Sequence, residues 1–386
     1  MSLKDNLVVV EQGGDGYRMT INGLIKLNLT GLKGSKVLVK PNCGRPFPPG
    51  SGVVTAPSVV AGVVDYLRDL GAKVTIGESC IMGVNAKEAF QKSGIAEVAN
   101  ERKIPLLDLD EGGGEVISIE GGTVLSQVRV SSKLKEYDFV VTVPVMKTHM
   151  HTVVSLGLKN MKGVLWRREK VRFHQLKAPH SVTRGYKELD LAIADLSKAI
   201  MPGLSVIDGT IGMEGLGPSA GMPKKVGMVI CSINPIAADL IAAYLMGFDP
   251  PKIPHLRLIA EGHGLSADLQ QFRVNPLRYE ELRKTFVPPP EKISFTFPGV
   301  RVMERQACSA CLSTVLVFLK RHYDQLKSKP LCIFVGRGVK DFARDLSEGA
   351  LCIGNCALEG TQGGIRISGC PPVASQIWEA LMKETA

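Results

Sequence analysis

The sequence has few aromatic residues and no long uninterrupted apolar run. Aromatic residues make up 5% of the 386 residues, hydrophobic residues 45% and charged residues 22%. This balance fits a compact aliphatic α/β protein and excludes mainly disordered, collagen-like and coiled-coil chains. The most apolar stretch, residues 226–248, is interrupted by Asn234, Pro235 and Asp239. It therefore predicts a strand, a turn and a buried helix, and we expect no membrane span.

The cysteines cannot all be paired in disulfides, because their number, nine, is odd. Charged residues appear almost at once in the opening MSLKDNLVVVEQGGDG, so we expect no secretory leader. Both features favour a reducing, cytoplasmic location. There, cysteines usually bind metal, act as nucleophiles or pack as small apolar groups.

The common nucleotide-binding motifs are absent as well. No GKS or GKT sequence marks a P-loop, and no GxGxxG leads from a strand into a helix. A glycine-rich loop does follow the apolar run LSVID, at residues 208–221. Asp208 at its start and Glu214 within it are candidate general bases or metal ligands. The alternative is a loop that only turns the chain.

Short runs rich in valine and isoleucine alternate with helical patterns along most of the chain. Examples are NLVVVE at Asn6, KVLVKPN at Lys36 and KVTIGES at Lys73. A helical pattern over residues 86–99 and the strand-like runs EVISIE and DFVVTVPV continue the series. Strands that are covered by helices on both faces lose the alternation of polar and apolar residues. The sequence therefore predicts an α/β fold with a mainly parallel sheet flanked by helices.

Four prolines at positions 288, 289, 290 and 298 break this pattern. Proline cannot donate a backbone hydrogen bond and favours an extended connector. We expect an α/β domain over residues 1–286, a proline-rich linker over 287–299 and a small α/β, cysteine-rich module over 300–386.

Most of the net charge of +10 lies in one segment. Residues 131–188 hold 12 lysines and arginines against four acids, and four of the seven histidines. This segment follows the run VVTVPVMKTH, and ligands of open α/β sheets bind at the carboxyl ends of strands. The sequences KPNC at Lys40 and GESC at Gly77 also end expected parallel strands, so we expect them at the same sheet edge as Lys147 and Asp208. Lys147, Lys159 and Lys162 are candidate ligands for a carboxylate or phosphate, with Asn160 to orient it.

The basic segment has other interpretations. His149 and His151 would lie on the same face of an extended strand, which suits a transition metal. Together with Asp208 and Glu214 they would form the site of a metal-dependent hydrolase. His149, Asp208 and Glu214 are also candidates for proton transfer to an anionic ligand. The segment lacks the aromatic residues typical of nucleic-acid sites, which argues against that partner. A solvated basic face is the simplest alternative.

Six of the nine cysteines lie in the last 79 residues, at positions 308, 311, 332, 352, 356 and 370. Cys308 and Cys311 form a CxxC pair, so both sulfurs can face one metal centre. Cys356 and Cys370 each end a short strand-like run, and Pro371 follows Cys370 as a proline follows the last cysteine of many bacterial cluster motifs. These four cysteines are the candidate ligands.

A [4Fe–4S] cluster fits this spacing better than zinc. Structural zinc usually takes two close CxxC-like pairs, whereas Cys356 and Cys370 are separated by 13 residues. Cys352 and Cys332 are alternative ligands, although Cys332 lies in the middle of an expected strand. A chance CxxC pair among buried core thiols remains the other interpretation.

Several segments together resemble the domain of unknown function 362 family. They include KPN, TAPSVVAGVVDYL, VTIGES, KTHMHTVVSLGLKNMKG and SVIDGTIGMEGLGP, within residues 36–265. Proteins of this family resemble iron–sulfur-associated redox proteins, often with ferredoxin-like modules. This chain departs from the ferredoxin pattern CxxCxxCxxxCP, because it has CSAC, GNC and GCPP instead.

The sequence thus leads to one expected function and one alternative from another class. We expect an iron–sulfur protein with a redox or electron-transfer role, a small anionic ligand at the strand ends and a redox partner protein. The alternative is a zinc-stapled, non-redox binding or scaffold protein whose basic face docks an acidic partner.

Overall fold

The computed structural model describes residues 6–290, 296–327, 330–339, 341, 346, 349–359 and 361–385. Residues 291–295 of the expected linker lie outside this set. The chain forms two compact units. The larger unit contains Met1–Gly215 and Met222–Pro288, and the smaller contains Leu216–Gly221 and Pro289–Ala386.

The larger unit is built on a mainly parallel sheet, in the order β12-β1-β11-β10-β7-β2-β3-β4, with β8 beside β10 and β9 beside β8. Its strands in the described part of the chain are β1 (Leu7–Gln12), β2 (Lys36–Pro41), β3 (Lys73–Glu78), β4 (Leu106–Asp108), β7 (Phe139–Val143), β8 (Val145–His149), β9 (Val153–Ser155), β10 (Leu204–Glu214), β11 (Met222–Ser232) and β12 (Arg273–Asn275). This confirms the predicted fold class.

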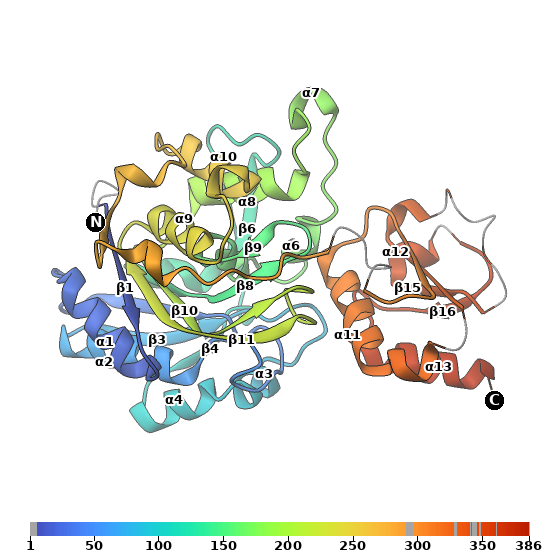
Figure 1. Ribbon diagram of the computed structural model, residues 1–386, viewed down its shortest axis with the longest axis horizontal. Coiled ribbons are helices and arrows are strands. Elements are labelled where there is room, and N and C mark those ends of the chain that lie inside the picture. The colour runs from blue at the N-terminus through green and yellow to red at the C-terminus, as the bar shows by residue number, and fades with distance from the viewer. Residues whose placement is uncertain are drawn as a thin grey trace. The chain divides into compact units, whose positions relative to one another are not determined.

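Helices cover both faces of this sheet (Figure 1). The α-helices of this unit in the described part of the chain are α1 (Gly16–Leu27), α2 (Pro57–Asp69), α3 (Ala86–Lys92), α4 (Ile95–Arg102), α5 (Gly157–Asn160), α6 (Glu169–Arg172), α7 (His180–Thr183), α8 (Glu188–Ala199), α9 (Pro235–Leu245) and α10 (Pro254–Gly262). Of these, α7 lies at the tip of an excursion beyond the sheet (Figure 1). Successive strand residues enter different cores: Val37 and Val39 pack with α1, α2 and α4, whereas Leu38 packs with the core of α8, α9 and α10. Burial on both faces explains why the strand sequences are uniformly apolar.

The structure differs from the expected pattern in three places. The run DFVVTVPV is divided at Pro144 into β7 and β8, because proline cannot donate to the ladder. The expected helix over 86–99 is two helices, separated at Gly94, whose φ of 73° is left-handed. The run EVISIE lies outside the main sheet, in an antiparallel hairpin of β5 (Gly114–Ser118) and β6 (Gln127–Ser131).

The smaller unit has a parallel sheet in the order β13-β14-β15-β16. Its elements are β13 (Val300–Glu304), α11 (Ser309–Leu326), β14 (Leu331–Val335), β15 (Leu351–Ile353), α12 (Asn355–Leu358), β16 (Ile365–Ile367) and α13 (Ala374–Thr385). Val315, Leu316 and Phe318 of α11 are fully buried. Within the described ranges of both units, no helix has the length and apolar character needed to cross a bilayer.

Candidate functional site

Polar side chains from neighbouring strands meet at the carboxyl edge of the larger sheet. Lys40 near the end of β2 and Glu78 at the end of β3 form an ion pair, with Nζ 2.8 Å from Oε1 and both side chains buried. Glu78 also accepts the backbone N–H groups of Ser79 and Cys43. Despite Lys40, burial raises the pKa of the Glu78 carboxyl. A buried pair of this kind requires several hydrogen bonds to offset its loss of hydration.

Asn160 links this ion pair to the next strands. Its Oδ1 accepts from Lys40 Nζ at 3.2 Å and from Asn42 Nδ2 at 3.0 Å. Its Nδ2 donates to Thr142 Oγ1 at 3.0 Å and to the Lys40 carbonyl oxygen. The amide expected to orient a ligand is thus fully engaged with protein groups. In this structure Asn160 positions Lys40 directly and Lys147 through Asn42.

Lys147 on β8 lies beside the same network, and no carboxylate among the described residues pairs with it. Its Nζ donates to Asn42 Oδ1 at 2.6 Å and to the Val53 carbonyl oxygen at 2.8 Å. Burial, with repulsion from Arg45, lowers the pKa of Lys147 to about 7. This ammonium therefore gains or loses its charge near neutral pH.

Lys159 and Lys162 are carried by the segment GLKNMKG, which two features hold against the sheet. Asp239 of α9 accepts the N–H groups of Gly157 and Leu158, at 2.8 and 2.9 Å, and so fixes the start of α5. Gly163 allows the close approach, since a Cβ there would lie 2.1 Å from Glu78 Oε1. The glycine of KNMKG is required by packing.

The two lysines lie among histidines. Lys162 Nζ donates to His174 Nε2 at 2.8 Å. His149, at the end of β8, is buried, and its Nδ1 accepts the backbone N–H of His151 at 3.1 Å. The two rings lie 5.9 Å apart. Burial, and then the charge of Lys159, lowers the pKa of His149 well below its usual value, so this imidazole is neutral at pH 7.

Lys159 is the centre of this group. Burial and the charges of Lys162 and Lys147 lower the pKa of its ammonium well below the usual value, whereas the charge of Asp190 acts in the opposite direction. We call Lys147, Lys159, Lys162, His149, His151 and His174 the cationic cluster. The three lysines predicted from the sequence are therefore brought within electrostatic reach of one another.

Two residues of this region escaped sequence reasoning, Asp190 on α8 and His255 on α10. Asp190 Oδ1 lies 3.7 Å from His255 Nδ1, and both side chains are buried. Burial raises the pKa of Asp190 to about 7, whereas burial and Lys159 lower that of His255 to about 3. The sequence signal that could have pointed to Asp190 was its position as a carboxylate at the start of the apolar run LDLAIADL.

Several buried atoms in this region have no hydrogen-bond partner among the described residues. They are Asp190 Oδ1, both ring nitrogens of His255, and His151 Nε2. Each unsatisfied buried polar group costs about 1–3 kcal/mol. Lys159 acts electrostatically on all three residues, which places them around one ammonium. A polar ligand beside Lys159 would supply the missing partners.

The predicted carboxylates Asp208 and Glu214 have other partners. The buried Asp208 accepts the N–H of Ala56 at 2.7 Å, just before α2, and the N–H and hydroxyl of Thr210. Glu214 Oε2 accepts from Lys224 Nζ at 2.8 Å and from the Val287 N–H. Both carboxylates therefore support local structure in this conformation.

The four predicted cysteine ligands lie together in the smaller unit. Cys308 precedes α11, and its Sγ accepts the N–H of Cys311 at 3.5 Å. A hydrogen bond with the Cys308 side chain, then burial, and then repulsion from Cys308, Cys370 and Cys356 raise the pKa of the Cys311 thiol. Each of the other three sulfurs is thus close enough to act on Cys311.

The backbone beside these thiols leaves space for a sulfur. Gly354 has a φ of 88°, and a Cβ there would lie 2.9 Å from Cys311 Sγ. Two hydrogen bonds join Asn355, next to Cys356, to Gly369, next to Cys370. The Asn355 N–H donates to the Gly369 carbonyl oxygen at 3.0 Å, and the Gly369 N–H donates to Asn355 Oδ1 at 2.7 Å. Cys356 is the second residue of the short helix α12, where the sequence predicted the end of a strand.

The thiols do not close around a single ion. Within the described part of the chain, no three His, Cys, Asp or Glu side chains form a group that could hold one metal ion. The ligands of a [4Fe–4S] cluster bind different irons, so they stand farther apart than those of one ion. All nine cysteines are described, and none is in a disulfide. Cys332 and Cys352 lie within strands β14 and β15.

Comparison with known proteins places the larger unit in a family. A curated relative, the thylakoid-associated protein sll1697 of Synechocystis, is 29% identical over 221 residues, which are 57% of this chain and 66% of that protein. The solved lactate racemase apoprotein from Thermoanaerobacterium thermosaccharolyticum is 15% identical, with a TM-score of 0.40 over 62% of this chain and 57% of its own. Residues 37–244 match the family described as Domain of unknown function (DUF362). The strand ends and lysines described above lie within this match, and the chain belongs to that family.

Proposed function

We propose that this chain is a cytoplasmic iron–sulfur protein whose larger unit binds a small anionic ligand at the cationic cluster. The C-terminal unit would hold a [4Fe–4S] cluster through Cys308, Cys311, Cys356 and Cys370. Such a cluster supplies one-electron chemistry when it is bound. The redox or electron-transfer role would also need a partner protein that delivers or removes the electron.

The proposed anion site rests on the lysines close to Lys159. Burial, then Lys162 and Lys147, lower the pKa of Lys159. Asp190 acts on Lys159 in the opposite direction, but burial raises the pKa of Asp190 itself to about 7. Like charges held together in a buried site destabilise one another unless an anion joins them. The neutral imidazole of His149 adds a ring nitrogen for hydrogen bonding. The site suits a carboxylate or phosphate group.

The proposal of a [4Fe–4S] cluster rests on the proximity of three thiols, those of Cys308, Cys356 and Cys370, to the thiol of Cys311. Besides the hydrogen bond with Cys308 and burial, repulsion from Cys308, Cys370 and Cys356 raises the pKa of the Cys311 thiol, because neighbouring thiolates repel one another. A cationic metal centre removes that repulsion and deprotonates the thiols that bind it. Iron, sulfide and zinc analysis of protein purified without oxygen tests this directly. Iron with acid-labile sulfide supports the proposal, whereas stoichiometric zinc without sulfide favours the zinc-stapled binding protein.

The structure gives less support to a metal-dependent hydrolase. His149 and His151 are neighbours, but the oxygens of Asp208 are bound by Ala56 and Thr210, and Glu214 is paired with Lys224. A hydrolase would require these two carboxylates to leave their present partners.

Replacing Lys159 by methionine should remove anion binding and leave the metal in place. Methionine fills a similar volume without the charge, so the fold should be retained. We expect the affinity for sulfate, measured by calorimetry, to fall at least tenfold, because a charge-assisted hydrogen bond contributes about 1.5–3 kcal/mol. The exposed Lys33, replaced by methionine, is the control. An equal loss of iron in the Lys159 variant would contradict the two-site proposal.

Sulfate binding should weaken as the pH rises from 6 to 8. Lys147, whose pKa is about 7, loses its positive charge over this range, and Asp190, whose pKa is also about 7, gains a negative charge. Both changes disfavour an anion, and sulfate itself does not titrate there. The Asp190→Asn variant should show a shallower pH profile. An affinity that is constant or rises with pH would argue against this site.

A further inference from the structure

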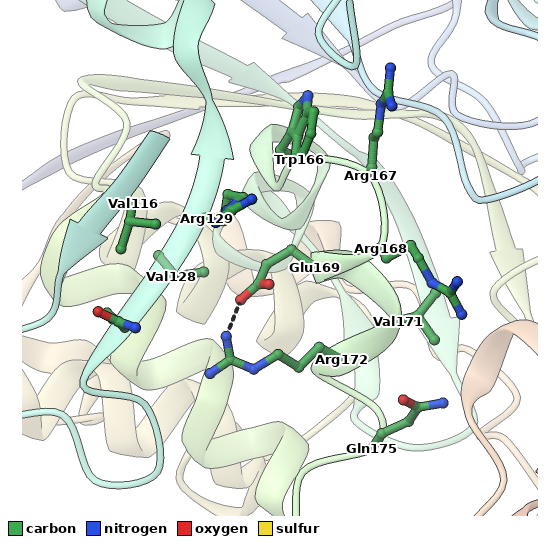
Figure 2. Close-up of a pocket in the computed structure, with 11 residues that line it drawn as sticks. Val116, Val128, Arg129, Trp166, Arg167, Arg168, Glu169, Val171, Arg172 and Gln175 are labelled. Atoms are coloured by element: carbon green, nitrogen blue, oxygen red, sulfur yellow. Dashed lines mark hydrogen bonds and ion pairs between the residues drawn. The ribbon is translucent and has the colours of Figure 1, made fainter. Parts of the chain in front are cut away.

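A pocket of about 550 Å³ opens on the larger unit (Figure 2). The residues given for its lining include none of the cationic cluster. One wall is the β5–β6 hairpin, with Val116, Val128 and Arg129. The other is the segment from Trp166 to Gln175, which includes α6. Its volume lies within the range of about 300–1,000 Å³ that is typical of small-molecule sites.

The sequence builds this pocket by seating Trp166 on the hairpin. A Cβ at Gly114 would lie 2.5 Å from Trp166 Cε3, so only glycine allows the indole to pack there. The backbone N–H of Trp166 donates to the carbonyl oxygen of Arg129 at 3.1 Å. The guanidinium carbon of Arg129 lies 5.8 Å from the indole centroid and that of Arg167 lies 4.9 Å from it. The indole of Trp166 thus makes cation–π contacts with both Arg129 and Arg167.

The segment is anchored from inside by Asp110. This carboxylate accepts the backbone N–H of Arg167 at 2.6 Å and pairs with Lys170 Nζ at 2.9 Å. Arg167 adopts a left-handed φ of 46°, which a non-glycine residue rarely takes without local support. The Asp110 carboxylate is thus engaged with the backbone of Arg167 and with Lys170. The arginine side chains are left to the pocket.

Charge compensation within the pocket is incomplete. Four arginines and one glutamate line it, a net charge of +3. The glutamate, Glu169, is already bound to Arg172 at 2.8 Å. Arg129, Arg167 and Arg168 have no acidic partner in the part of the chain that the structure describes. Guanidinium groups match phosphate oxygens in a bidentate geometry.

The pocket also has an apolar side and an unused donor. Val116, Val128 and Val171 line it together with the arginines. The indole Nε1 of Trp166 is buried and donates to no acceptor among the described residues. A ligand with anionic groups alone would leave the valines uncovered. The mixed lining fits a molecule with an anionic end and an apolar or aromatic body.

We propose that this pocket binds an organic diphosphate, with the phosphates on Arg129, Arg167 and Arg168 and the organic part against the valines. Three unpaired guanidiniums match the charge of a nucleoside diphosphate, about −3 at pH 7. This inference is independent of the cationic cluster and of the metal centre.

Adenosine diphosphate is the probe for the test, with pyrophosphate and inorganic phosphate beside it. Binding should appear in calorimetry and as a change in Trp166 emission, measured in a Trp378→Phe background because these are the two tryptophans of the chain. Arg129→Gln and Arg168→Gln should each weaken binding about tenfold, the effect of losing one charge-assisted hydrogen bond. Arg301→Gln, an exposed arginine of the other unit, should have no effect.

Several results would overturn the proposal. Absence of both heat and emission change with adenosine diphosphate would exclude the site. Equal affinity for pyrophosphate would exclude the contribution of the valines. Equal weakening by Arg301→Gln would show non-specific attraction to a basic protein. Binding of RNA without binding of the nucleotide would assign the surface to a polymer instead.

Discussion

Replacing Cys311 by serine should abolish iron and sulfide binding. Cys311 is the thiol on which the sulfurs of Cys308, Cys356 and Cys370 all act, and it packs against Gly354. A serine hydroxyl stays protonated at neutral pH and does not replace a thiolate ligand. We expect iron to fall from about four atoms per chain, the content of one [4Fe–4S] cluster, to less than about one. Metal and sulfide analysis after anaerobic purification measures this loss.

Cys332→Ser is the matched control for this experiment. Cys332 belongs to the same unit but lies within β14, where its neighbour in register is Arg301 of β13. It should keep its iron and its visible absorbance. The opposite pattern, with iron lost from the Cys332 variant and retained in the Cys311 variant, would show that the ligand set is wrong. The sulfate affinity of the larger unit should be unchanged in both variants.

The sequence was sufficient to place the strand-end residues together. Uniformly apolar runs predicted parallel strands, and the polar residue ending each run was therefore expected at one edge. The ion pair of Lys40 with Glu78 and the contact of Lys147 with Asn42 show why this works. Parallel strands align their carboxyl ends, so a residue's place in its run determines its place in the sheet.

Sequence reasoning failed where contacts join elements far apart in the chain. Asp190 and His255 are 65 positions apart, and helices α8 and α10 bring them within 3.7 Å. Neither residue lies at a strand end, and neither has a local motif. For Asp208 the sequence suggested a functional role where the structure shows a structural one. Its position at an expected strand end had made it a candidate general base or metal ligand. In the structure its oxygens hold the backbone before α2 and Thr210.

Local residues also decided how the expected elements were divided. Pro144 separates β7 from β8, and the second piece turns back through an antiparallel pairing with β9. This turn brings His149 and His151 next to each other, at 5.9 Å. An unbroken strand through residue 151 would have carried the two rings along the sheet edge. The turn at residues 150–152, which follows β8, therefore places these two imidazoles of the cationic cluster side by side.

Replacing Lys40 by methionine should be among the most destabilising single changes in the larger unit. Lys40 is fully buried, and its removal leaves the Glu78 carboxylate buried without a cation. Breaking one side of a buried ion pair costs about 3–5 kcal/mol. We expect the free energy of unfolding, measured by denaturant titration of the full chain, to fall by about that amount. Lys26→Met is the control, because its pair with Glu11 is half-exposed and contributes less than about 1 kcal/mol.

The pH dependence of the Lys40 variant distinguishes an unpaired carboxylate from a simple packing defect. Burial already raises the pKa of Glu78 in the native chain, and loss of Lys40 raises it further. The folded variant then binds a proton that the unfolded chain binds only at lower pH, so stability should return as the pH falls from 7 towards 5. A further change, Glu78→Leu, should restore most of the stability at pH 7. A deficit that is equal at both pH values and persists in the double variant would mean that Lys40 acts through packing alone.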